Sequence, residues 1–235
     1  MADSNKTEIM NPKDDLDSSR ALRRIDAVYL LEEISTVLNF HRGIFYTIRE
    51  ILLRPGKSVQ HFIHKDRSRM VKPVVFVILC SLAYTVFQQF FGFEDGYINY
   101  SFEENNMVNK MFEWTDQNYG YTNLFFSIFI AFYVRIFFRK HAYNFFEVLI
   151  LLCYTIGVSM LLFAFFGIID TMTSVQIVDK GFLIGIIYIA WGIGDLFEGN
   201  VFKNTLKGFL CYILGLTTFV FLVLIVGTVL DQLLT

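Results

Sequence analysis

The chain contains 235 residues, of which 54% are apolar and only 18% are charged. Soluble globular proteins have about 45–50% apolar and about 25% charged residues, so this composition argues against a soluble chain. The net charge of -2 says little, because charged residues are concentrated before residue 73 and long apolar runs follow. Composition alone therefore predicts a protein that is embedded in a membrane.

The residues before the first long apolar run predict a disordered arm followed by a helical head. Residues 1–17 are rich in Asp, Asn and Lys, a composition typical of disorder. Residues 18–72 predict amphipathic helices that lie in the cytoplasm or at the membrane interface. Apolar residues recur every three to five positions from Leu22 to Leu38, and a second helix is expected from about Gly43 to Leu53. Pro55 ends this second helix, because the residue before a proline is disfavoured in the helical region.

The head carries a set of positive charges that we name the basic collar. Anionic lipid headgroups attract such residues by about 1 kcal/mol each. A sharper hypothesis is a cytosolic binding surface for an anionic ligand, such as a nucleotide or a nucleic acid. The sequence leaves both interpretations open. The collar comprises the candidate ligand-binding residues Arg42, Arg49, Arg54, Lys57, Lys65, Arg67, Arg69 and Lys72.

One segment of the head carries a distinctive motif. Residues 38–73 read LNFHRGIFYTIREILLRPGKSVQHFIHKDRSRMVKP, and Tyr143–Glu147 reads YNFFE. Both segments resemble a bacterial family of multi-span membrane proteins that is catalogued as domain of unknown function 3667. The first resemblance rests on Gly43, Tyr46, Thr47, Glu50, Leu53, Arg54, Pro55, Gly56, Phe62 and Pro73.

The resemblance covers most of the chain from about residue 20 onward, and it implies a membrane fold without an assigned activity. Many members of the family carry a zinc ribbon with paired cysteines before the first helix. This chain has no such cysteines, so no zinc-binding role is carried over. In size and layout the chain also looks like the membrane effectors of two-gene anti-phage systems such as Hailong.

Five apolar stretches predict membrane-spanning helices, because about 20 apolar residues cross the hydrocarbon layer. Acidic residues dominate the loop after the first stretch, whereas the loops after the second and the fourth carry basic residues. This alternation predicts an all-α bundle over residues 73–235, with a cytoplasmic N-terminus in the inner membrane of a bacterium. The expected spans are about 73–93, 122–138, 144–169, 181–197 and 205–230.

Charged side chains at bilayer depth are costly and are often functional. Arg135 and Glu147 lie six residues on either side of His141, so they are expected at similar depths on two antiparallel helices. They form an ion pair there, or Arg135 extends to the headgroups and Glu147 caps a helix turn. The pore or gating candidates are Gln88, Gln89, Arg135, Glu147, Asp195 and Glu198.

The fourth predicted span is rich in glycine, which allows close helix approach at a subunit interface, at a pore wall or within one protomer. Its Gly192–Asp195 segment matches the GxGD motif of intramembrane aspartyl proteases. The nearest second carboxyl group, that of Asp170, is expected about 20 Å from Asp195 along the membrane normal. We therefore exclude protease chemistry, which needs two carboxyl groups that share protons. The helix-packing candidates are Gly181, Gly185, Gly192 and Gly194.

The sequence contains no other enzymatic motif, and we expect no enzyme activity, no cofactor and no metal site. The first functional hypothesis is a homo-oligomeric channel or pore-type effector in the lipid bilayer. A nucleotide or nucleic-acid signal in anti-phage defence would gate it from the cytoplasmic side. The alternative is a membrane-anchored scaffold or sensor that recruits a cytosolic partner, and a small transporter is a weaker third hypothesis.

Overall fold

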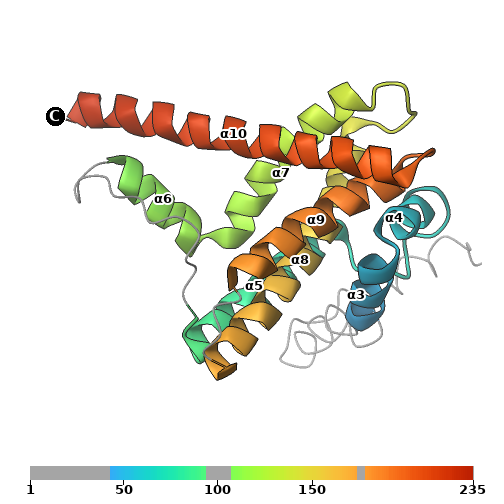
Figure 1. Cartoon of the computed structure of the whole chain (residues 1–235), viewed down its shortest axis with the longest axis horizontal. Coiled ribbons are helices and arrows are strands. Elements are labelled where there is room, and N and C mark those ends of the chain that lie inside the picture. The colour runs from blue at the N-terminus through green and yellow to red at the C-terminus, as the bar shows by residue number, and fades with distance from the viewer. Residues whose placement is uncertain (1–42, 94–106, 174–177, 235) are drawn as a thin grey trace, which may run out of the picture. The chain divides into compact units, whose positions relative to one another are not determined.

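The computed structural model describes residues 43–93, 107–173 and 178–234, and every element in these ranges is an α-helix. The predicted disordered arm, the first predicted head helix and Arg42 lie outside the described residues. In the described residues, the second predicted head helix is helical from Gly43 and ends at Leu53, as expected. In chain order the helices are α3 (Gly43–Leu53), α4 (Pro55–His64), α5 (Pro73–Phe91), α6 (Met107–Gln117), α7 (Tyr119–Phe137), α8 (Phe145–Thr173), α9 (Val178–Leu196) and α10 (Val201–Leu234) (Figure 1).

Four of the described helices are long and apolar enough to cross a membrane, and they coincide with four of the five predicted spans. These are α5, residues Gly120–Phe137 of α7, α8, and residues Val201–Leu233 of α10. Helix α9 corresponds to the remaining prediction, but it carries Asp179, Lys180 and Asp195 within its 19 residues. Its crossing of the membrane therefore stays a prediction.

Helix α8 is the central element of the bundle. It packs against α5, α7 and α9, and every residue from Leu151 to Val158 is buried. A helix that is apolar on all sides is typical of such a buried position. In helices α5 and α10, by contrast, only 22% of the most apolar stretch is buried, and both carry many exposed apolar side chains. This arrangement suits a bundle surrounded by lipid.

The four glycines of α9 lie against neighbouring helices of the same protomer. A Cβ atom at Gly181 would stand 2.7 Å from Cβ of Phe166, and one at Gly192 would stand 2.6 Å from Cγ2 of Thr155. One at Gly185 would contact α8 at 3.5 Å, whereas Gly194 faces the backbone of α10 at 2.6 Å. The glycines thus allow close packing of α9 inside one protomer, which is one of the three roles that the sequence left open.

Helix α6 lies along the C-terminal half of α10. Val108 and Phe112 of α6 form a buried apolar cluster with Val223 of α10. The backbone N–H of Met107 also donates a hydrogen bond to Oδ1 of Asp231 at 3.4 Å. Apolar packing and the hydrogen bond of Met107 therefore hold α6 against α10.

Candidate functional site

The most specific polar contact between the head and the bundle is made at the start of α4. Pro55 occupies the first helical position, where its missing N–H is no loss. The next two backbone N–H groups, of Gly56 and Lys57, donate to Oδ2 of Asp195 at 3.0 and 3.2 Å. Arg54, the residue before the helix, makes no capping hydrogen bond with its own side chain. A carboxylate from α9 therefore caps α4, and its negative charge also suits the helix N-terminus.

Gly56 is required for this contact because the two backbones almost touch. A Cβ atom at Gly56 would stand 2.2 Å from the carbonyl carbon of Asp195 and 2.3 Å from the nitrogen of Leu196. No side chain fits at such distances unless one backbone moves. The Arg-Pro-Gly-Lys motif thus has a physical meaning: proline starts α4, and glycine lets it lie against α9.

Two further hydrogen bonds complete the connection between α9 and the head. The side-chain amide of Gln60 donates to the carbonyl of Leu196 at 2.8 Å, and the hydroxyl of Tyr188 donates to the carbonyl of Ile51 at 2.7 Å. The latter carbonyl lies in the last turn of α3, where helix carbonyls lack partners within their own helix. We name this set the clamp; it comprises Gly56, Lys57, Gln60, Tyr188 and Asp195.

The loop between α4 and α5 is also tied to the bundle. The backbone N–H of Val71 donates to the hydroxyl of Thr47 at 3.0 Å, and the hydroxyl of Tyr154 donates to the carbonyl of Val71. Thr47 is fully buried on α3, and Tyr154 is fully buried on α8. The head is therefore anchored both to α8 and to α9.

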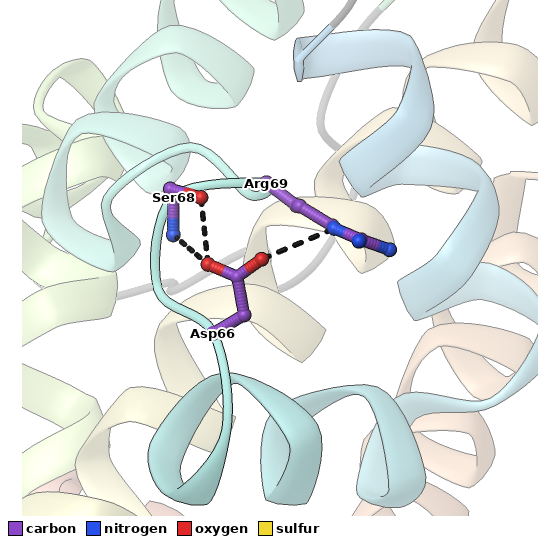
Figure 2. A network of polar contacts seen from close by, with 3 residues as sticks. All are labelled: Asp66, Ser68 and Arg69. Carbon is purple, nitrogen blue, oxygen red and sulfur yellow. Dashed lines mark hydrogen bonds and ion pairs between the residues drawn. The ribbon is translucent and has the colours of Figure 1, made fainter.

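The basic collar remains open to solvent. The side chains of all seven collar residues in the described part of the chain are exposed. Arg69 is partly neutralised, since its Nε atom lies 3.1 Å from Oδ2 of Asp66 (Figure 2). Ser68 donates from its hydroxyl and its backbone N–H to the other oxygen of Asp66, at 2.6 and 2.8 Å. These two hydrogen bonds, followed by the charge of Arg69, hold the pKa of Asp66 below its usual value.

Aromatic contacts bring further basic residues to the same end of the bundle as the head. Phe138, after α7, stacks on Phe197, after α9, with ring centroids 4.0 Å apart. Tyr143 contacts both Phe197 and His64 of α4, and partial burial raises the pKa of its phenol. Lys207 lies over the Phe138 ring, 5.7 Å from its centroid. The exposed basic residues of these loops and of the first turns of α10 are Arg139, Lys140, Lys203 and Lys207.

The structure separates the other gating candidates. Glu147 accepts a hydrogen bond from the backbone N–H of Asn144 at 2.8 Å, and its own backbone N–H donates to Oδ1 of Asn144 at 2.9 Å. This reciprocal capping box confirms the capping role for Glu147. Arg135 is exposed, and no ion pair joins it to Glu147 in the described structure. Gln89 and Glu198 are exposed as well, and Gln88 is half-buried.

Sequence reasoning singled out Asp195 but missed its partners. The register of α8 and α9 brings Gly181 near Phe166 and Gly192 near Thr155. Asp170, near the end of α8, is therefore far from Asp195, as the exclusion of protease chemistry requires. The clamp residues Gln60 and Tyr188 were not predicted, because neither a glutamine in the amphipathic α4 nor a tyrosine in the apolar α9 indicates by itself which carbonyl it will bind. A carboxylate at the end of one helix and a Pro-Gly start in another could have indicated their pairing.

The fold and this site define a multi-pass membrane protein with a head that is hydrogen-bonded to its bundle. Residues 42–85 match the model of a family described as protein of unknown function (DUF3667), which confirms the resemblance of the head motif; the Tyr143–Glu147 segment lies outside the match. The matched segment contains the whole described head and the first part of α5. No curated protein and no solved structure matches the chain.

Proposed function

We propose that this membrane protein is an effector whose head binds an anionic ligand and whose bundle responds by opening a pore between copies of the chain. The head would face the cytoplasm at the inner membrane of a bacterium. The observation that carries the proposal is the continuity between the collar and the clamp: Lys57 exposes its ammonium group and also donates its backbone N–H to Asp195. A ligand bound at the collar would therefore act directly on the contact with α9.

Electrostatics suggests how binding could loosen the clamp. A phosphate at the exposed side chains of Arg54 and Lys57 would lie beside the carboxylate of Asp195. The two negative groups would compete for the same helix N-terminus, which favours one anion near its unpaired N–H groups. Ligand binding would weaken the attachment of α9 to the head, and it would favour the state in which that attachment is broken.

The proposed pore requires more than one copy of the chain. The cavity between α7, α8, α9 and α10 is lined largely by apolar and aromatic side chains, and none of its lining residues is charged. An ion path through such a space would be strongly unfavourable. A path between copies is supported by the exposed apolar side chains of α9, which are Phe182, Leu183, Ile184 and Ile187. In anti-phage defence, the opening of such a pore would collapse ion gradients.

A second candidate function is a membrane-anchored scaffold that recruits an acidic cytosolic partner. It is favoured by the exposure of the entire described collar, because a surface with such charge can bind a partner without any movement of the bundle. The two candidates differ in one observable, the passage of ions.

The test is an ion-flux assay on the full chain in liposomes, with the oligomeric mass measured on the same preparation. We expect a defined oligomer and flux that rises when nucleotides or short oligonucleotides are added. Arg54→Gln combined with Lys57→Gln should abolish the response. Lys180→Gln, an exposed lysine in the first turn of α9, is the charge-matched control and should respond fully. A monomer without flux, combined with capture of an acidic partner, would establish the scaffold instead.

A further inference from the structure

An apolar groove lies between α6, α7 and α10, away from the clamp. Its volume is about 680 Å³, and most of its wall is apolar. Met111 of α6, Phe125 of α7, and Leu222 and Val226 of α10 are among the residues that form it. A space of this size is within the usual range for small-molecule sites, which are about 300–1,000 Å³.

The groove adjoins the cavity inside the bundle. Thr115, Thr122 and Phe219 line both spaces, and the inner cavity adds about 280 Å³. The hydroxyl of Thr122 donates to the carbonyl of Thr115 at 3.2 Å, so this polar pair at the junction satisfies itself. The groove itself, whose wall is almost entirely apolar, is therefore suited to a long apolar ligand without hydrogen-bonding groups along its length.

The polar features of the groove lie at the level expected for a membrane surface. The apolar span of α7 begins at Gly120, only three residues after α6 ends at Gln117. Trp114 and Tyr121 line the groove and are 55% and 69% exposed, and such aromatic residues are enriched where hydrocarbon meets headgroups. Lys110 is the only charged residue among those that line the groove, and its side chain is exposed.

We propose that this groove binds one acyl chain of an anionic phospholipid, with the lipid phosphate held by the ammonium group of Lys110. The apolar wall would contact the acyl chain, and Trp114 and Tyr121 would lie at the depth of the headgroups. The ammonium group of Lys110 would complement the negative charge of the phosphodiester. Besides α6, the wall is built by α7 and α10, two helices that qualify as candidate membrane spans, so lipid is the medium expected at its mouth. The proposal does not depend on what the head binds.

Trp114 provides a reporter inside the groove. The chain has two tryptophans, so Trp191→Phe leaves Trp114 as the only one. The full-length variant is placed in phosphatidylcholine vesicles that contain a small fraction of either phosphatidylglycerol or phosphatidylcholine with brominated acyl chains. Bromine quenches tryptophan on contact. We expect brominated phosphatidylglycerol to associate with Trp114 about fivefold more strongly, the effect of one lysine near a phosphate.

Two further variants in the same background separate a site from ordinary surrounding lipid. Lys110→Gln should remove the preference for phosphatidylglycerol. Val226→Phe should fill the groove and reduce quenching by both lipids, whereas Ile225→Phe, at a 60% exposed position of α10 that does not line the groove, should leave quenching unchanged. Equal quenching by the two lipids, with the Val226 and Ile225 variants alike, would show surrounding lipid only and overturn the proposal. The purification profile of each variant confirms that it folds.

Discussion

The two contacts that α9 and α10 make with surface helices are built on different physics. The head is fixed to α9 by hydrogen bonds with defined donors and acceptors, and Gly56 lies directly against the α9 backbone. Helix α6 is fixed to α10 chiefly by the apolar packing of Val108, Phe112 and Val223. Hydrogen-bonded contacts depend on atomic positions, while apolar contacts depend on the area and volume that are filled. Substitutions should therefore act abruptly at the head and in proportion to volume at α6.

The largest effect is expected for Gly56→Ala, which places a methyl group 2.2 Å from the carbonyl carbon of Asp195. One of the two backbones must move, at a cost of about 3 kcal/mol in the free energy of unfolding. Thermal unfolding in detergent should show a large fall in the midpoint. Gly43→Ala is the matched control, because its nearest neighbour would be a side-chain carbon at 3.7 Å. Equal behaviour of the two variants would contradict the close contact with α9.

Val223→Ala tests the apolar contact between α10 and α6. The side chain is only 5% exposed in its cluster with α6, and the lost packing should cost about 2 kcal/mol. Hydrogen exchange should increase in peptides from α6 and stay unchanged in peptides from α4. Val229→Ala, at a 48% exposed position of the same helix, should have little effect. Faster exchange in α4 would show that the two contacts are coupled.

Asp195→Ala removes the acceptor of the clamp without creating a steric conflict. Loss of a helix cap costs about 1 kcal/mol, and Asp195→Asn should cost less because an amide oxygen still accepts. The direct readout is hydrogen exchange in the peptide that contains Gly56 and Lys57, which should become faster. Glu198→Ala is the control, since this exposed carboxylate lies near the same end of α9. Unchanged exchange in the Asp195 variants would contradict the capping role.

The sequence predicted the long apolar helices because their causes are local, whereas α6 was missed because it lies in the acidic stretch that was expected to be a loop. Apolar run length placed four spans, and Pro55 gave the boundary between α3 and α4. The clamp was not predicted, because a pairing across 139 residues depends on how α9 packs, and no local pattern encodes that. Asp195 attracted attention through its cost at bilayer depth, but that cost does not identify the partner. The groove beside α6 could not be predicted either, because its walls come from three separate segments whose packing no local pattern encodes.

Asn144→Ala tests whether Glu147 caps α8 or pairs with Arg135. Removing one half of the capping box should lower stability by about 1 kcal/mol or less, with faster exchange confined to the first turn of α8. Arg135→Gln should leave both stability and exchange unchanged, because the arginine is exposed and makes no ion pair with Glu147 in the described structure. If Arg135→Gln destabilised the protein as much as Asn144→Ala, the predicted ion pair would replace the cap.

The smallest effect is expected at Asp66, whose interactions are all local and whose oxygens are held by Ser68 and Arg69. Its pKa is lower in the folded chain, so the carboxylate orders the loop at any pH above its usual value of about 4. This contribution is lost as the pH falls through the lowered pKa, when the carboxyl group becomes protonated. Asp66→Asn should remove the loss of exchange protection, measured relative to the intrinsic rate at each pH, that residues 65–72 otherwise show on acidification, and it should leave the midpoint of unfolding at neutral pH unchanged. A fall in that midpoint would mean that the loop around Asp66 supports the clamp. The contacts of Asp66 would then stabilise the whole head and not only their own loop.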